Sequence, residues 1–354
     1  MKFRLIHQLP PTHGNPRNSE GAFLRGKRGE ILFAYSRYSG DSNHDHAACD
    51  IAMIVSRDEG ESWSEPRLIA RAAEFGTKNI MSVSAVEQKN GDLAFYFLIK
   101  ENNRTTTMGR VVSSDGEVWR AERCNFEAVP SAYYVVNNDR IVRLSDGRLV
   151  APASFCTAEE IFLHGGRHMS ATILISEDDG ASFSRSEQIF SLPNPADWAR
   201  GYEEPGIIEY SDRLYYWIRT YLGRQYETVS TNGTNGFFEP RPSEFTSPNS
   251  PMQIKSFDGV AYAIYNPVPR YNGRVEPEGS WGRTPFVIRK STDEGKTWGI
   301  LNTIENNPTR GYGYPAVFKT NDGCLLLAYC RGNAEDGNTL CRLGIAKAEI
   351  TSIE

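Results

Sequence analysis

The 354-residue sequence lacks the features that mark several large classes of protein. It contains no run of about 18 apolar residues, so we expect no membrane-spanning helix and no membrane partner. Its formal net charge of -5 offers no basic surface, which argues against a nucleic-acid partner. No segment shows a sustained helical period, and a helical fold is therefore disfavoured.

Cysteine is also scarce, with six residues in the chain. They are Cys49, Cys124, Cys156, Cys324, Cys330 and Cys341. Their positions show neither metal-ligand spacing nor the density of a disulfide scaffold, which favours free buried thiols in a reducing compartment. The first ten residues lack the apolar core of a secretory signal. We therefore expect a cytoplasmic protein that uses no metal and no cofactor.

The sequence does contain a repeated eight-residue pattern, Ser-x-Asp-x-Gly-x-x-Trp. Ser56–Trp63 and Ser291–Trp298 are full copies. Ser176–Phe183 changes only the last aromatic residue, Ser113–Trp119 is one residue short, and Ser230–Phe237 is degenerate. In such a turn the Asp accepts from free backbone N–H groups, the Gly takes a positive φ and the aromatic residue packs beneath. The pattern, known as the Asp-box, therefore indicates a repeated hairpin and carries no chemistry of its own.

A second set of turn signals alternates with the first, each between two apolar runs. These signals are Arg28-Gly29, Asn90-Gly91, Asp146-Gly147, Ser211-Asp212, Asp258-Gly259 and Asn321-Asp322-Gly323. The strand-like segments that follow them are Ile31–Tyr35, Leu93–Leu98, Leu149–Ala153, Leu214–Ile218, Val260–Tyr265 and Leu325–Tyr329. Six units of three or four antiparallel strands predict an all-β fold, a six-bladed β-propeller formed by residues 1–354 as one domain. The alternatives are a β-sandwich array or a parallel β-helix, but β-helix rungs are much shorter than a blade of roughly 40 to 50 residues.

The last unit lacks an Asp-box and one outer strand. Phe3–His7 is predicted to supply that strand and close the ring. Because strands alternate in direction, the Gly turns and the Asp-boxes share one rim, and the opposite rim surrounds the central pocket. Trp63 and Trp298 should therefore lie away from the pocket.

Charged and aromatic residues gather on the predicted pocket rim. Blade four contributes Glu204 and Arg219, blade five contributes Arg283, and blade six contributes Tyr312 and Tyr314. Blades one and three add Glu20, Arg37, Asp45, Asn138 and Arg140. Such a rim suits the binding of an acidic sugar.

At these residues the chain resembles the sialidase superfamily, in particular its bacterial Asp-box (BNR) repeat branch, over nearly its whole length. The resemblance implies that Tyr314, or alternatively Tyr312, is the nucleophile. It implies that Glu204 is the base that takes the phenol proton, and that Asp45 is the acid/base residue in a loop before the first Asp-box. Arg219 and Arg283 match the arginines that hold the substrate carboxylate.

The resemblance fails at the first inner strand. Sialidases open it with Arg-Ile-Pro, whose Arg is the first of three that grip the carboxylate, whereas this chain has Ser19-Glu20-Gly21 at that point. Arg37 or Arg140 is predicted to reach the same space. We expect Glu20 to accept from a sugar hydroxyl or amine, and Asn138 and Tyr312 to be further substrate contacts.

The resemblance thus implies a retaining exo-glycosidase acting on a terminal acidic sugar, such as sialic acid or a related nonulosonate. An unperturbed phenol has a pKa near 10, which explains the need for a base beside the nucleophile. As the proton donor, Asp45 is expected to have a raised pKa. Two alternatives stay open. One is a glycosidase or lyase acting on another acidic sugar such as a uronate. The other is a non-catalytic carbohydrate-binding propeller, which loss of the Tyr–Glu pair would mark, although this chain keeps the pair.

Overall fold

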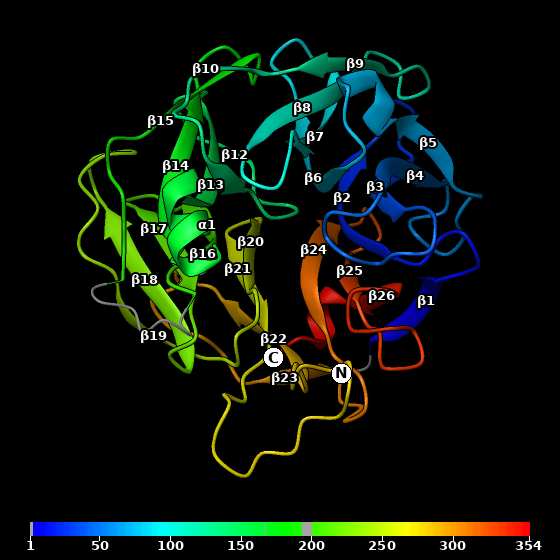
Figure 1. Ribbon diagram of the computed structural model, residues 1–354. Coiled ribbons are helices and arrows are strands. Elements are labelled where there is room, and N and C mark those ends of the chain that lie inside the picture. Colours follow the sequence, from blue (N-terminus) through cyan, green and yellow to red (C-terminus); the bar gives the residue numbers. More distant parts are fainter. Residues whose placement is uncertain (1–2, 167, 193–199) are drawn as a thin grey trace.

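A computed structural model describes residues 3–166, 168–192 and 200–354. Six sheets stand around a central axis, and Figure 1 views the ring along that axis. Strands that follow one another in the sequence pair antiparallel within each blade. The predicted six-bladed β-propeller is confirmed.

Each blade is one sheet, whose strands succeed one another from the central axis outward. Blade one contains β2 (Asn18–Arg25), β3 (Ile31–Tyr38), β4 (Cys49–Ser56) and β5 (Arg67–Ala70). Blade two contains β6 (Ile80–Glu87), β7 (Leu93–Lys100), β8 (Thr106–Ser113) and β9 (Arg120–Arg123). Blade three contains β11 (Tyr133–Val135), β12 (Val142–Arg143), β13 (Leu149–Cys156), β14 (Ser170–Ser176), β15 (Ser182–Arg185) and β10 (Asn125–Ala128).

Blade four contains β16 (Glu203–Glu209), β17 (Leu214–Arg219), β18 (Arg224–Ser230) and β19 (Arg241–Thr246). Blade five contains β20 (Gln253–Phe257), β21 (Val260–Tyr265), β22 (Phe286–Ser291) and β23 (Asn302–Glu305). Blade six contains β24 (Gly313–Lys319), β25 (Cys324–Cys330), β26 (Leu343–Glu349) and β1 (Arg4–Leu9). Every strand predicted after a Gly turn is present.

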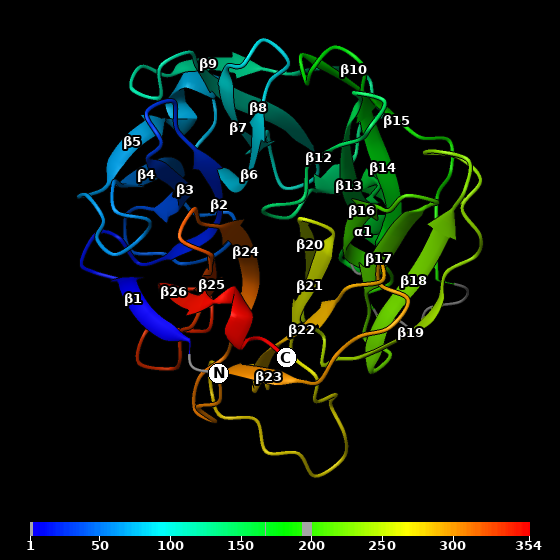
Figure 2. The same ribbon diagram turned by 180° about the vertical axis from the view of Figure 1, so that it is seen from behind.

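The N-terminal strand closes the ring, as predicted. Strand β1 pairs antiparallel with β26, and Leu9 lies opposite Leu343. The strand extends two residues beyond the predicted segment. The two chain ends lie close together beside blades five and six in both views (Figure 2).

The apolar faces of neighbouring blades form the core. Between blades six and one, Phe33 and Ile54 pack with Leu326 and Ile345, and all four are buried. Alternation along each strand directs these side chains into the interface between blades, which leaves the strand ends free to carry polar residues.

The Asp-boxes form the predicted hairpin turns. In the first copy, Ser56 Oγ donates to Asp58 Oδ1 at 2.8 Å and accepts from Gly60 N at 2.8 Å. Asp58 also accepts from Ser62 N at 2.9 Å, and Trp63 Nε1 donates to Gly60 O at 3.0 Å. The equivalent Asp293 accepts from the Thr297 side chain and backbone, and these hydrogen bonds lower the pKa of Asp293 to about 2.

The Asp-box aromatic residues lie away from the main cavity, as the strand directions predict. Trp63 packs on Phe23 and Trp298 packs on Phe245, inside the blade interfaces. Neither lines the central cavity.

The inner strands of four blades share a feature that the sequence pattern does not reveal. Their pairing register shifts after Ser19, Met81, Glu203 and Gly313, which marks a β-bulge at the same height in blades one, two, four and six. The bulged residues Glu20, Ser82, Glu204 and Tyr314 have positive φ angles of 54°, 63°, 41° and 57°. Bulges re-aim side chains and are frequent beside active sites. All four residues line the central cavity.

One α-helix occurs among the described residues, α1 (Ala158–His164). Thr157 caps its first turn by accepting from Glu160 N. Ile161 of this helix lines the cavity. The 3-10 turns Ala72–Phe75 and Ile350–Ser352 complete the helical structure of the described part. No helix there is long and apolar enough to cross a membrane.

Candidate active site

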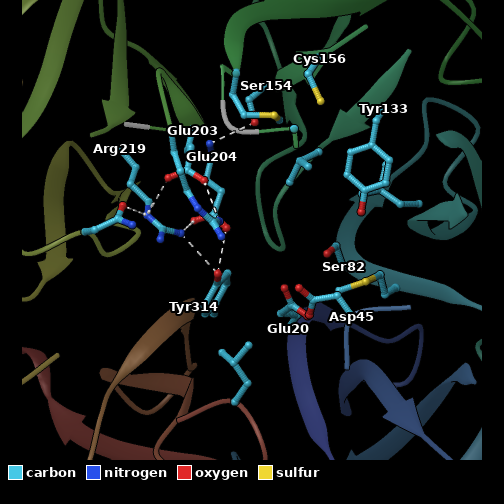
Figure 3. Close-up of a pocket in the computed structure, with 18 of the residues that line it drawn as sticks. Glu20, Asp45, Ser82, Tyr133, Ser154, Cys156, Glu203, Glu204, Arg219 and Tyr314 are labelled. Atoms are coloured by element: carbon cyan, nitrogen blue, oxygen red, sulfur yellow. Dashed lines mark hydrogen bonds and ion pairs between the residues drawn. The ribbon is translucent and has the colours of Figure 1, made fainter. Parts of the chain in front are cut away.

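A cavity of about 580 Å³ opens on the rim opposite the Asp-boxes. Residues of all six blades line it, and Figure 3 shows two groups of charged side chains facing each other across it. One group comes from blades four and six and contains Glu204, Arg219 and Tyr314. The other comes from blade one and contains Glu20 and Asp45.

A phenol and a carboxylate form the centre of the first group. Tyr314 OH donates to Glu204 Oε1 at 2.8 Å, and both side chains are largely buried. Arg219 Nη1 donates to Glu204 Oε2 and lies 3.5 Å from the Tyr314 oxygen.

The surroundings set the protonation of this pair. Burial alone would raise the pKa of Glu204, but the Arg219 guanidinium outweighs it and the pKa is lowered. Burial, and then the Glu204 charge, raises the pKa of Tyr314 well above its ordinary value. At neutral pH the site therefore presents a protonated phenol to an ionised carboxylate that can take its proton.

Two arginines stand beside this pair and are joined through Asn249. Arg219 Nε donates to Asn249 Oδ1 at 2.7 Å, and Arg283 Nη2 donates to the Asn249 carbonyl at 3.3 Å. The Arg283 guanidinium lies between the rings of Trp281 and Tyr314, at 4.8 and 5.5 Å from their centroids. The guanidinium group also lines the cavity. A guanidinium group at a cavity wall suits an anionic ligand.

Glu203 contacts the same cluster of arginines. Its Oε1 lies 3.2 Å from Arg200 Nη1, and its Oε2 lies 3.8 Å from Arg219 Nε. Burial raises the pKa of Glu203 despite these guanidinium groups. Arg200, Arg219 and Arg283 thus face Glu203 and Glu204, which leaves this side of the cavity with an excess of positive charge.

The second group is built on Arg17, whose side chain is 2% exposed. Its Nη2 donates to Glu20 Oε2 at 2.9 Å and its Nη1 donates to Asp45 Oδ1 at 2.6 Å. Lys100 Nζ donates to the Asp45 carbonyl at 2.5 Å, and Asn79 Nδ2 donates to the same oxygen at 3.1 Å. In this group two cations balance two carboxylates.

The expected raised pKa of Asp45 is wrong. Burial of the carboxyl group by the cavity wall would raise its pKa, but Arg17 and Lys100 outweigh that effect and the pKa is lowered. Its side chain remains 60% exposed at the cavity mouth. In contrast, burial raises the pKa of Glu20 although the same Arg17 opposes it.

Arg37 is not in the site, contrary to prediction. It lines a separate groove with Tyr35 and Trp63 between blades six and one. Along β3 the side chains of Ser36 and Arg37 point to opposite faces, and Ser36 takes the inner one.

Arg140 and Asn138 do not line the cavity either; both are buried close to the Glu204–Tyr314 pair. Arg140 donates to Gln253 Oε1 and to Met252 O, and its guanidinium stacks on Trp217. Burial lowers the pKa of Arg140 to about 10. Asn138 Nδ2 donates to the carbonyls of Gly21 and Tyr314 and so joins blades one and six. Their predicted substrate contacts are wrong because both side chains brace neighbouring blades.

Tyr312 is a core residue, so its predicted contact with substrate is also wrong. It is 0% exposed and packs on Phe286 and Tyr329. Its hydroxyl is buried without a hydrogen-bond partner in the described part of the chain. The cavity is lined by Tyr314 and not by Tyr312.

We expect Tyr312→Phe to leave turnover and the melting temperature close to those of the wild type. The substitution removes only a hydroxyl that is buried without a partner, and such a removal is neutral or stabilising. Steady-state kinetics and thermal unfolding of the purified variant measure both. A loss of turnover of tenfold or more would show that the hydroxyl reaches the reacting atoms after all.

Sequence reasoning missed several residues of the site. Arg17 directly precedes β2. The sequence pattern predicts an inner strand that starts only at Ser19, so Arg17 falls outside the predicted site. A charged residue just before an inner strand could have indicated it. Other missed polar residues include Ser82, Lys100, Arg200, Glu203 and Asn249. Glu203 and Glu204 both reach the cavity because the bulge interrupts strand alternation. Among the described residues, no group of three or more His, Cys, Asp or Glu side chains is placed to hold a metal ion.

Comparison with known proteins agrees with this architecture. The BNR repeat-like domain profile matches residues 32–327. A protein of unknown function from Dyadobacter fermentans shares 15% identity at a TM-score of 0.73, covering 98% of this chain and 99% of that one. NanB sialidase of Streptococcus pneumoniae shares 14% at 0.72, covering 100% and 71%.

Trypanosoma rangeli sialidase, solved in complex with 2,3-difluorosialic acid as a covalent intermediate, shares 13% identity at a TM-score of 0.67. The match covers 94% of this chain and 54% of that one. At these identities the likeness shows the fold. No curated protein matches the sequence.

Proposed function

The chain belongs to the BNR repeat-like domain family, and from this membership and the site geometry we propose that it is a retaining exo-glycosidase acting on a terminal acidic sugar such as sialic acid. The observation that carries the proposal is the 2.8 Å hydrogen bond from the Tyr314 phenol to the Glu204 carboxylate inside the cavity. The same kind of bond joins Tyr215 to Glu227 and Tyr329 to Glu305 in the blades. Only the Tyr314–Glu204 pair among these three lines the cavity, beside Arg219 and Arg283.

Tyr314 is the nucleophile in this mechanism. Glu204, whose pKa is lowered, takes the phenol proton as the oxygen attacks the anomeric carbon. The bond to the leaving oxygen breaks, and a glycosyl-tyrosine intermediate forms. The covalent intermediate of the Trypanosoma rangeli sialidase supports this route. A neutral nucleophile also avoids repulsion by the carboxylate of the substrate.

Arg219 and Arg283 hold that carboxylate. Both arginines line the cavity. Charge-assisted hydrogen bonds from two guanidinium groups orient a planar carboxylate strongly. The positive excess on this side of the cavity supports an anionic sugar over a neutral one.

Asp45 serves the leaving group and the attacking water. Its ion pair with Arg17 keeps it ionised, which suits the second step, where it takes a proton from water to release the sugar. In the first step it must be protonated, and the ion pair opposes this. Leaving groups that need no proton are therefore expected to depart more easily than sugar alcohols.

The experiment measures hydrolysis of 4-methylumbelliferyl glycosides of N-acetylneuraminic acid, its deaminated analogue and glucuronic acid, together with sialyllactose. We expect turnover of a nonulosonate glycoside, and a faster aryl than lactose-linked reaction. Asp45→Ala should slow the lactose-linked substrate by roughly 10²- to 10⁴-fold, the usual contribution of a general acid, and slow the aryl glycoside much less.

The same assay distinguishes the alternatives. If only the glucuronide is cleaved, the substrate is a uronate and not a nonulosonate. Binding of the sugars without any cleavage would make the protein a carbohydrate-binding propeller. An equal effect of Asp45→Ala on both leaving groups would remove Asp45 from the acid role.

A further inference from the structure

The β-bulges that direct the proposed catalytic pair into the cavity have equivalents that direct two further side chains into it. Glu204 and Tyr314 are bulged residues with positive φ, and so are Glu20 and Ser82 at the same height in blades one and two. A left-handed backbone is unfavourable for residues other than glycine and clusters at functional sites. Four equivalent residues of this kind line one cavity.

A shared serine connects the bulges of Glu20 and Ser82. Ser36 Oγ lies 3.5 Å from the Glu20 carbonyl, to which it donates, and accepts from Ser82 N at 2.9 Å. Figure 3 shows the two side chains next to each other, across the cavity from Glu204 and Arg219. The pair is therefore held as a unit on the wall opposite the arginines.

Both side chains keep unused hydrogen-bonding atoms. Arg17 Nη2 and Ser19 Oγ both donate to Glu20 Oε2, at 2.9 and 3.2 Å, and within the described residues nothing donates to Oε1. Ser82 Oγ has no hydrogen bond in the same part of the chain. Glu20 is 5% exposed and Ser82 4% exposed, so these atoms belong to the cavity wall and not to the open surface.

The charge balance around Glu20 and Ser82 favours an uncharged hydrogen-bond donor on the ligand. Arg17 and Lys100 balance Glu20 and Asp45, so the corner has no net charge to attract a cation. A carboxylate oxygen beside a serine hydroxyl is instead a partner for sugar hydroxyl groups, which both donate and accept.

We propose that Glu20 and Ser82 form a hydroxyl-binding subsite for the sugar, opposite the Arg219–Arg283 carboxylate site. The proposal rests on the proposed function and narrows its substrate class. The sugar carries its carboxylate toward blades four and five and free, unacylated hydroxyl groups toward blades one and two. Glu20 and Ser82 are then specificity-determining residues and take no part in proton transfer.

Kinetics of Ser82→Ala, Glu20→Gln and the double variant test the subsite on the 4-methylumbelliferyl glycoside that the wild type cleaves best. We expect KM to rise about 2- to 10-fold for Ser82→Ala and roughly 10-fold or more for Glu20→Gln, with kcat within about threefold. The rise in KM of the double variant should be smaller than the product of the two single rises, because both residues bind one pair of hydroxyl groups. Glu177→Gln, on the exposed opposite rim, is the matched control and should change nothing.

Ser82→Ala separates binding from folding, because it breaks no ion pair and should leave the melting temperature unchanged. Unchanged KM for both single variants, with an active wild type, overturns the subsite and leaves the proposed function standing. If the wild type cleaves nothing, calorimetric binding of free N-acetylneuraminic acid decides. If the wild type binds the sugar and Glu20→Gln weakens that binding, the subsite is supported and the proposed glycosidase activity is overturned. If the wild type does not bind the sugar, both proposals are overturned.

Discussion

Tyr314→Phe and Glu204→Gln are each expected to lower kcat by about three orders of magnitude or more. The first removes the attacking oxygen, and the second replaces the ionised carboxylate that takes its proton by an amide that cannot. Residues that act as a unit in one step each cost nearly as much as the whole unit. The double variant should therefore be no slower than the slower single variant. Steady-state kinetics on the preferred aryl glycoside measures all three.

Folding controls make that result interpretable. Tyr314→Phe keeps the ring that packs beside Arg283 and should keep a cooperative thermal transition. Tyr312→Phe, two residues away, is the matched control with the same chemical change in the core. If Tyr314→Phe retained more than a tenth of wild-type turnover, Tyr314 would not be the nucleophile and the mechanism proposed above would be wrong.

The second large effect concerns stability, and it comes from Arg17. Arg17→Met is expected to lower the free energy of unfolding by about 3 to 5 kcal/mol, the usual cost of leaving a buried charge without its partner. Arg17 and Glu20 are both nearly inaccessible to solvent, so the Glu20 oxygen that faces Arg17 loses a buried partner. Urea denaturation of the wild type, Arg17→Met, Glu20→Gln and the double variant gives the coupling energy. The double variant should be more stable than Arg17→Met, and additive effects would contradict the pairing.

The loss in free energy of unfolding caused by Arg17→Met should depend on pH in a defined direction. Burial raises the folded-state pKa of Glu20, and Arg17 opposes that rise. Without Arg17 the pKa is higher still, so the folded variant binds a proton as the pH falls while the unfolded chain, near 4.3, does not. The stability loss caused by Arg17→Met is therefore largest above the raised pKa of Glu20 and becomes smaller as the pH falls. Unfolding at pH 8 and at pH 5 should show the smaller deficit at pH 5.

The blades follow from sequence because their signals are local. An Asp-box binds its own backbone and a Gly turn joins adjacent strands, so each hairpin is visible in about ten residues. Glu204, Arg219, Arg283 and Tyr314 could be assigned to one rim because strand direction alone decides which end of a strand faces the pocket. That assignment needs no atomic detail.

The remaining positions depend on which face a side chain occupies and on contacts between blades, and on the inner strands the bulges hide the face. One inserted residue reverses the alternation, so counting along an inner strand fails beyond it. Arg37 has the height on β3 that predicts a place in the pocket, but it points to the outer groove. Arg140 has the right height as well, yet its partners Gln253 and Met252 come from another blade, a contact that no local pattern encodes.

The pairing of β1 with β26 sets the order in which the chain can reach its final state during translation. Residues 4–9 leave the ribosome before the strands of blades one to five, and their partners at 343–349 are synthesised after those strands. The first strand must therefore wait unpaired while five blades and most of the sixth are made. A strand edge left open for that time invites pairing with another chain. Strand β1 is short and carries Arg4, His7 and Gln8 along its length, and such polar side chains on an edge discourage that misassembly until the ring can close.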